Sequence, residues 1–128
     1  MGSLDDLKIL DFSTLLPGPY ATLMLADMGA EVLKISSASR PDIVLDYPPF
    51  IGDTGVSASQ AWLGRNKKTM FLNLKTGEGK AVVKELVKEY DIVLEQFRPG
   101  VMEKLGLGYE DLKAVNPKLI YCSLTGYG

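Results

Sequence analysis

The sequence predicts an α/β fold built on a Rossmann-like, doubly wound parallel sheet. Short apolar runs of strand length alternate along the chain with stretches of helical composition, and turns rich in Gly and Pro separate them. A strand–helix–strand unit of this kind uses a right-handed crossover, which makes its two strands parallel. The length of 128 residues predicts that residues 1–128 form a single domain.

The first part of the chain is predicted to be one strand–helix–strand unit. Residues 8–12 (KILDF) form a β-type run, and the stretch 13–19, which holds two prolines and a glycine, cannot continue it. Residues 20–28 have a helical composition, with Pro before them and Gly29 after them, the usual asymmetry of helix ends. Residues 31–35 (EVLKI) complete the unit as a second strand.

A long irregular connection follows before regular elements return. Residues 36–64 are punctuated by Ser, Pro and Gly, with a short helix predicted at 57–63. A connection of this length inside a domain is usually functional or reaches toward a partner. Residues 69–74 are predicted to form a strand, and Thr76 to cap a helix over residues 78–90. The apolar residues of that helix share one face: Val82, Val83, Leu86, Val87 and Tyr90.

The last part of the chain repeats the alternation. Residues 91–95 form a short apolar strand, and Arg98-Pro99-Gly100 forces a turn after it. Short helices are predicted near residues 101–105 and 109–115, and a last strand at residues 118–124. Because no element follows that strand, we expect the chain to be a piece of a longer protein.

Composition and charge disfavour several classes of partner. The formal net charge of −2 is too small and of the wrong sign for nucleic-acid binding. No apolar run approaches the ~20 residues of a membrane span, and the start MGSLDDLK lacks the regions of a signal peptide. The only cysteine, Cys122, rules out an internal disulfide and fits a reducing, cytoplasmic setting. We expect Cys122 to be a small core residue and expect no metal site, because the chain has no histidine.

Polar and aromatic side chains gather directly after the strand at residues 91–95. Glu95 is followed by Gln96, Phe97 and Arg98. Ligands of open α/β sheets bind outside the carboxyl ends of the strands, so this stretch is a candidate binding site. A solvated turn after a core strand is the alternative.

A basic cluster, Arg65-Asn66-Lys67-Lys68, precedes another predicted strand. Together with Arg98 and Lys104 it would form a rim suited to phosphate groups, while a solvated charged turn is the alternative. Neither common phosphate motif is present. Pro17-Gly18-Pro19 stands where a dinucleotide-binding G-x-G-x-x-G would follow the first strand, and residues 77–80 lack the spacing of a phosphate loop.

Three groups of residues carry a resemblance to a known family. The first comprises residues 10–12 (LDF), 17–22 (PGPYAT) and 25–32 (LADMGAEV), and the second comprises residues 66–69 (NKKT) and 72–75 (LNLK). The third comprises residues 97–106 (FRPGVMEKLG) and 116–121 (NPKLIY). In this order they resemble signatures of the family III CoA-transferases, which include formyl-CoA transferase, carnitine-CoA transferase and α-methylacyl-CoA racemase. The resemblance covers nearly the whole chain.

The resemblance implies that the chain binds coenzyme A or acyl-CoA. In the family, the turn after the first strand approaches CoA, the segment after the third lies along its adenine, and the end of the fourth strand lines the cofactor. A basic residue further on contacts a phosphate. The matching residues here are Leu16, Pro17, Leu72, Asn73, Leu74, Lys75, Gln96, Phe97, Arg98 and Lys104. At Ser36-Ser37 the sequence departs from the family's Glu and basic residue, so a phosphate contact there would need Arg40.

The resemblance also implies the chemistry and the assembly. Family transferases use an aspartate nucleophile, expected here beyond Gly128, to exchange CoA between an acyl-CoA and a small carboxylic acid through an anhydride. No catalytic residue is therefore assigned within this chain, and Asp11 and Asp27 are interpreted as structural. Family members form interlaced homodimers. A racemase of the same superfamily, which moves the α-proton with His and Asp, is an alternative. An alternative of another class is a non-catalytic nucleotide-binding or interaction module.

Overall fold

The computed structural model describes residues 2–128 and confirms the α/β prediction. Five parallel strands form one sheet in the order β3-β2-β1-β4-β5. They are β1 (Lys8–Asp11), β2 (Glu31–Ser36), β3 (Lys67–Phe71), β4 (Ile92–Glu95) and β5 (Ile120–Ser123). Leu10 at the centre of β1 lies beside Leu33 of β2 and beside Val93 of β4, so β1 is the middle strand of the sheet.

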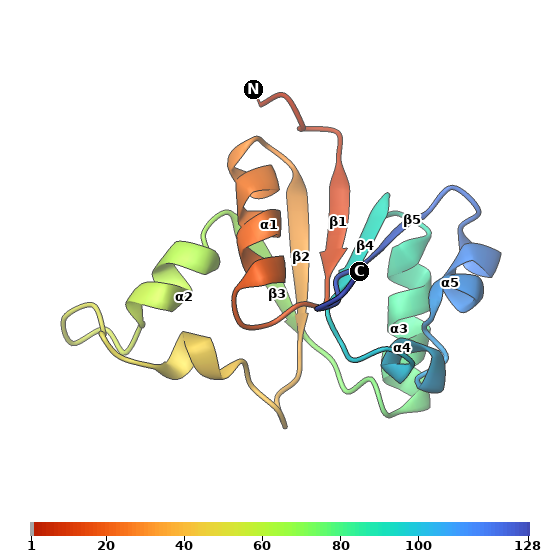
Figure 1. The fold of residues 1–128 in the computed structure, drawn as a ribbon. Helices are drawn as coiled ribbons and strands as arrows, with labels where there is room; N and C mark the ends of the chain where they lie inside the picture. Colours follow the sequence, from red (N-terminus) through yellow and green to blue (C-terminus); the bar gives the residue numbers. More distant parts are fainter. Residues whose placement is uncertain (1) are drawn as a thin grey trace.

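The helices cover both faces of the sheet, as a doubly wound fold requires. They are α1 (Pro17–Asp27), the 3₁₀ helix η1 (Ile43–Asp46), α2 (Ala58–Leu63), α3 (Gly77–Val87), α4 (Val101–Lys104) and α5 (Tyr109–Val115). Figure 1 shows α1 and α2 on one side of the sheet and α3, α4 and α5 on the other. The chain builds β1, β2 and β3 outward and then returns through α3 to place β4 beside β1. The switch in strand order therefore lies between β1 and β4.

The core is divided between these two faces because side chains alternate along each strand. Ile9 and Val32 pack with Ala26 and Ala30 on the face that α1 covers. The larger cluster lies on the opposite face, under α3, α4 and α5. Its buried members are Leu10, Phe12, Leu33, Ile35, Val83, Val87, Tyr90, Val93, Met102, Leu107, Leu112 and Leu119.

Several element boundaries differ from the predictions. Helix α1 begins at Pro17 and not at residue 20, because Pro is well suited to the first helical turn, where its missing N–H is not needed. Thr76 caps α3 as predicted, accepting a bond from the Gly79 N–H at 3.1 Å. That helix ends at Val87 and not at residue 90. Asn116 satisfies carbonyls after its end: Asn116 Nδ2 donates to Val87 O at 2.9 Å and to Tyr90 O at 3.0 Å.

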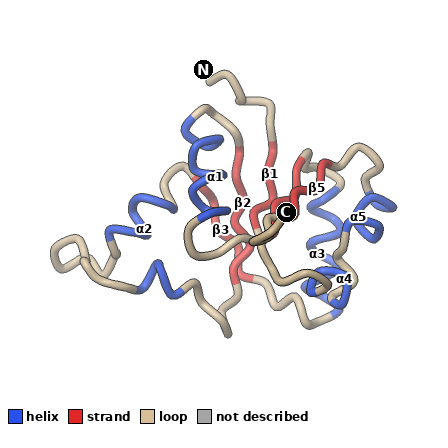
Figure 2. Tube along the Cα trace, in the orientation of Figure 1, coloured by secondary structure: helices blue, strands red, loops and turns tan. Residues whose placement is uncertain are grey.

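The long connection between β2 and β3 extends away from the sheet and is mostly without regular structure (Figure 2). The predicted short helix is present as α2, capped by Ser57, whose Oγ accepts from Gln60 N at 3.0 Å. The 3₁₀ helix η1 was not predicted, and Asp42 caps it. Strand β3 begins two residues before its predicted start and ends at Phe71. Among residues 2–128, no helix is long and apolar enough to cross a membrane.

One prediction of burial is wrong. Cys122 is exposed, because it lies on the edge strand β5, on the face opposite the half-buried Tyr121. Its neighbour on that face, Ile120, is 60% exposed. The apolar face predicted for α3 is only partly buried: Gly79, Val83 and Val87 are buried, whereas Val82 is 38% exposed.

Candidate functional site

The candidate site lies at the switch point, where the turn after β1 meets the turn after β4. A hollow of about 320 Å³ opens there. It is lined by Pro17, Gln96, Phe97, Arg98, Pro99, Leu124, Thr125 and Gly126. Four of the predicted site residues, from segments about 80 positions apart in the sequence, therefore share one surface. A crevice at the carboxyl ends of the strands, at the topological switch, is where open α/β sheets bind ligands.

Gln96 joins the two turns. Its Oε1 accepts from the Gly18 N–H at 2.9 Å, and its Nε2 donates to the Thr14 carbonyl at 2.7 Å. Gly18 is needed at this contact, because a Cβ on it would clash with the side chain of Ser13 and would lie 2.7 Å from Gln96 Oε1. The amide of Gln96 thus holds the β1–α1 turn in place beside Phe97 and Arg98.

Glu95 is a buried acid that braces the turn after β4. It is 5% exposed at the last position of that strand. Its Oε2 accepts from the Phe97 N–H at 2.8 Å, and its Oε1 accepts from Ser123 Oγ at 2.5 Å. Through Glu95, these bonds connect the start of the β4–α4 turn to β5. The segments after β4 and after β5, which both line the hollow, are therefore held to the sheet.

A second buried acid, Asp11, organises the end of β1. Its Oδ1 accepts from the backbone N–H of Ser13 at 2.8 Å and also from the Ser13 hydroxyl, and its Oδ2 accepts from Thr22 Oγ1 at 2.5 Å. Lys67 completes the network with an ion pair to Asp11 at 3.7 Å and with bonds of 2.8 Å to Pro19 O and Thr22 Oγ1. Burial lowers the pKa of Lys67, and the nearby Asp11 carboxylate opposes that shift. Asp11 is thus the last residue of β1, as the sequence predicts, and both of its carboxylate oxygens are engaged by contacts within the chain.

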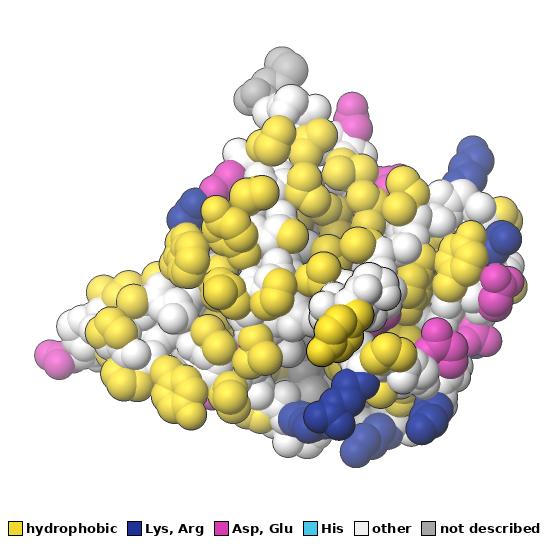
Figure 3. Space-filling model, viewed as in Figure 1, with side chains coloured by type: hydrophobic (Ala, Val, Ile, Leu, Met, Phe, Trp, Pro, Cys, Tyr) yellow, Lys and Arg dark blue, Asp and Glu magenta, His cyan; other side chains and the backbone are white. Residues whose placement is uncertain are grey.

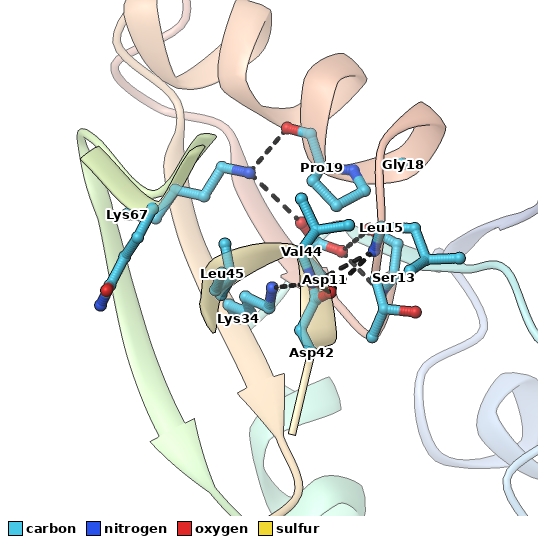
Figure 4. A network of polar contacts seen from close by, with 12 residues as sticks. Asp11, Ser13, Leu15, Gly18, Pro19, Lys34, Asp42, Val44, Leu45 and Lys67 are labelled. Carbon is cyan, nitrogen blue, oxygen red and sulfur yellow. Dashed lines mark hydrogen bonds and ion pairs between the residues drawn. The ribbon is translucent and has the colours of Figure 1, made fainter. Parts of the chain in front are cut away.

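Asp42, in the long connection, was not predicted to take part. Figure 4 shows its carboxylate between Lys34 on β2 and the β1–α1 turn. It accepts from the Leu15 N–H at 3.2 and 3.1 Å, from the Val44 N–H at 3.2 Å and from Lys34 Nζ at 3.1 Å. Its position in an irregular stretch offers no sequence signal, because only the fold places residue 42 beside residue 15.

The remaining predicted site residues lie outside the hollow. Leu16 is 51% exposed, next to Pro17. Residues 72–75 follow β3 at the carboxyl edge of the sheet: Leu72 and Leu74 pack against the core, and Asn73 and Lys75 are exposed. Lys104 is exposed at the end of α4. Figure 3 shows Lys and Arg side chains gathered at the lower edge of this view, below the carboxyl ends of the strands in Figure 1.

The predicted rim that joins residues 65–68 to Arg98 and Lys104 is wrong. The cluster opens β3, at the opposite edge of the sheet, and Arg65 and Lys68 pair with acids there, while Lys67 pairs with the buried Asp11. Arg65 forms two bonds to Asp27, at 3.1 and 2.5 Å, and Lys68 lies 3.3 Å from Glu31. The bond from Arg65 lowers the pKa of Asp27. Arg40, expected as a substitute phosphate ligand, is exposed in the loop after β2.

The structure thus combines a Rossmann-like, doubly wound sheet with a hollow at its switch point. The chain belongs to CoA-transferase family III, whose family model matches residues 4–128. This membership agrees with the resemblance that the sequence motifs carry.

Individual relatives support the same assignment. The chain is 44% identical to a succinyl-CoA:mesaconate CoA-transferase of Haloarcula marismortui, over all of this chain and 33% of the relative. It is 41% identical to the human succinyl-CoA:glutarate CoA-transferase, over 98% of this chain and 28% of the relative. The crystal structure of a CaiB/BaiF family protein from Brucella suis superposes with a TM-score of 0.91 at 40% identity, covering 99% of this chain and 34% of that one. The chain thus spans about a third of the length of the relatives it matches.

Proposed function

We propose that this chain forms the CoA-binding part of an enzyme that transfers CoA between carboxylic acids. The observation that carries the proposal is the hollow at the switch point, which unites Pro17 with Gln96, Phe97 and Arg98. Relatives named CoA-transferases, at 41–44% identity, favour a transferase over a racemase or a non-catalytic module.

In this proposal each part of the carboxyl edge meets a different part of CoA. Leu16 and Pro17 contact the cofactor from the β1–α1 turn, and Phe97 packs against it. Arg98 and Lys104 are exposed cations that pair with phosphate oxygens. The segment Leu72, Asn73, Leu74 and Lys75 lies along the adenine. Gln96 contributes by holding the turn, because both ends of its amide are bonded to Thr14 and Gly18.

The reaction we propose uses an aspartate from a segment that follows Gly128. A carboxylate oxygen of that aspartate attacks the thioester carbonyl, the C–S bond breaks, and CoA leaves as the thiolate. The acyl group stays on the aspartate as a mixed anhydride. The CoA thiolate then attacks the aspartyl carbonyl of this anhydride, which releases the first carboxylate and leaves CoA on the aspartate as a thioester. The acceptor carboxylate attacks that thioester and expels the thiolate, and the thiolate attacks the acceptor's carbonyl in the new anhydride, which gives the new acyl-CoA and restores the aspartate. On this basis we expect residues 1–128 alone to bind CoA without transferring it.

We further propose that the whole protein is a cytoplasmic, interlaced homodimer. The exposed apolar side chains of the long connection support this proposal, because surfaces of this kind usually mark an interface. Ile43, Tyr47, Phe50 and Ile51 are 48–60% exposed.

Titration calorimetry with CoA tests the binding site. Residues 1–128 and the variants Arg98→Ala and Lys104→Ala would be compared, and each variant is expected to bind about tenfold more weakly because it loses a charge-assisted phosphate contact. Lys118→Ala is the matched control, since Lys118 is exposed at the opposite edge of the sheet, just before β5. Equal affinity in all three variants would contradict the proposed site.

A further inference from the structure

We propose that Asp42 is a positioning residue for CoA binding, which acts by holding Leu15 in a left-handed backbone conformation. This inference rests on the proposed CoA site. Leu15 immediately precedes Leu16 and Pro17, the two residues through which the β1–α1 turn would meet the cofactor. The direction of that turn depends on the backbone of Leu15, and Asp42 is the side chain that bonds to its N–H.

Leu15 has a conformation that its side chain disfavours. Its φ is +63°, a value that Gly adopts freely and that other residues with a Cβ adopt rarely. Leu15 is 42% exposed, so burial of its side chain does not impose this conformation. The two bonds from Leu15 N to the Asp42 carboxylate, at 3.2 and 3.1 Å, are the contacts that favour it.

Asp42 is itself fixed in place. Lys34 Nζ lies 3.1 Å from Asp42 Oδ2, and the two side chains are 8% and 3% exposed. The Val44 N–H also donates to Asp42 Oδ1 at 3.2 Å. Lys34 projects from the interior strand β2, so the ion pair anchors the carboxylate to the sheet and not to a mobile surface group.

Hydrogen bonds therefore hold the β1–α1 turn on two sides. On the side of the hollow, Gln96 donates to Thr14 O and accepts from Gly18 N. From the long connection, the Asp42 carboxylate accepts from Leu15 N, as Figure 4 shows. Between these bonds Leu16 stays half exposed, where a ligand can reach it. Through Asp42, the connection between β2 and β3 sets the geometry of the proposed cofactor turn.

Two double variants separate the hydrogen bond from the ion pair. Lys34→Met with Asp42→Asn removes both charges but leaves a side-chain oxygen that can accept from Leu15 N. Lys34→Met with Asp42→Ala removes both charges and the acceptor. We expect the amide hydrogen of Leu15 to exchange faster in the Ala variant alone. We expect CoA to bind that variant about tenfold more weakly than the Asn variant, by calorimetry on residues 1–128.

Adding Leu15→Gly to the Lys34→Met, Asp42→Ala variant tests whether the backbone conformation of Leu15 is what Asp42 controls. A general loss of stability would not be repaired by this change. Gly adopts a positive φ without the acceptor, so it should restore CoA affinity to the Lys34→Met, Asp42→Ala variant. Asp27→Asn is the control: it weakens a different link, to Arg65, at the far end of α1, and should leave both measurements unchanged.

The outcomes distinguish this inference from the proposed function. Equal Leu15 exchange in the Asn and Ala variants would overturn the role of Asp42, whether or not CoA binds. Equal CoA affinity in the two variants, or no rescue by Leu15→Gly, would also overturn it. If the unmodified chain binds no CoA while the exchange rates differ as expected, the CoA site within this chain is refuted, and Asp42 only shapes the turn.

Discussion

The ammonium group of Lys67 lies 3.7 Å from the carboxylate of Asp11, and the two side chains are 2% and 0% exposed. The pair joins the start of β3 to the end of β1 across the intervening strand β2. Because a buried charge without its partner is costly, this contact should be among the most important for the stability of the domain.

Lys67→Met should lower the free energy of unfolding by about 3–5 kcal/mol, because it leaves the Asp11 carboxylate buried without its counter-charge. Urea unfolding followed by circular dichroism would measure the loss. Adding Asp11→Asn should recover part of it, since the second change removes the stranded charge. A loss below about 1 kcal/mol in the single variant would contradict this account.

Arg65→Ala offers a matched comparison from the same basic cluster. Its ion pair with Asp27 is open to solvent, with side chains 48% and 34% exposed. Exposed pairs contribute little, so the loss should stay below about 1 kcal/mol in the same urea experiment. A loss as large as that of Lys67→Met would show that the Arg65 contact is more than a surface ion pair.

Gly18→Ala should open the β1–α1 turn. The added Cβ would clash with Ser13 and press against Gln96 Oε1, so the bond from Gly18 N to Gln96 cannot keep its length of 2.9 Å. We expect a loss of about 1–3 kcal/mol in the free energy of unfolding and weaker CoA binding by calorimetry. Gly77→Ala is the control, since a Cβ there meets no atom within 4 Å.

The contact between Tyr90 and Glu31 predicts that the free energy of unfolding depends on pH in the alkaline range. Burial, and then the bond of 3.1 Å to Glu31, raises the pKa of Tyr90 from 10.0 to about 12. A raised pKa in the folded state stabilises the protein below pH 10, and this contribution is lost as the pH rises toward about 12. Tyr90→Phe should cost about 1 kcal/mol at pH 7, and the difference from the unmodified protein should shrink at about pH 11.

Urea titrations of both proteins at the two pH values would test this. Tyr121 also has a raised pKa, because it is largely desolvated, but it is present in both proteins and cancels from the difference. A difference that stays constant with pH would show that the pKa of Tyr90 is unchanged by folding.

Cys122 should react with a thiol reagent in the folded chain of residues 1–128. The side chain is exposed on the edge strand β5, so unfolding is not needed for access. We expect one thiol per chain to be modified at a rate that changes little on adding urea. If Cys122 reacts only after the domain unfolds, its thiol is buried. The prediction from its apolar sequence neighbours, that Cys122 is a core residue, would then be correct.

Sequence predicted the elements well where local chemistry decides them. Short runs of strand composition predicted each of the five strands, and the Thr76 cap predicted the start of α3 to within one residue. The predicted element boundaries were less accurate where residues distant in the sequence make contact. Helix α3 ends at Val87, three residues before its predicted end, and Asn116, 29 positions away, donates to the Val87 carbonyl, a contact with no local signal.

The candidate site shows the same division. Pro17, Gln96, Phe97 and Arg98 could be chosen from motifs and from their place after predicted strands, and the structure gathers them around one hollow. The prediction of a basic rim failed because residues 65–68 precede and open β3, at the amino edge of the sheet, whereas Arg98 and Lys104 follow β4, at the carboxyl edge. Asp42 was missed altogether, since an acid in an irregular stretch resembles any solvated loop residue.

By itself, then, the sequence determined the order of strands and helices, the turns that end them and the family to which they belong, because propensity, periodicity and turn chemistry act over a few residues. Only the tertiary structure decided which charges pair, which apolar residues stay exposed and which turn is held under constraint. Lys67 with Asp11, and Asp42 with Leu15, meet because parallel strands bring distant segments to one place. Burial then makes those few contacts strong enough to set the shape of the site.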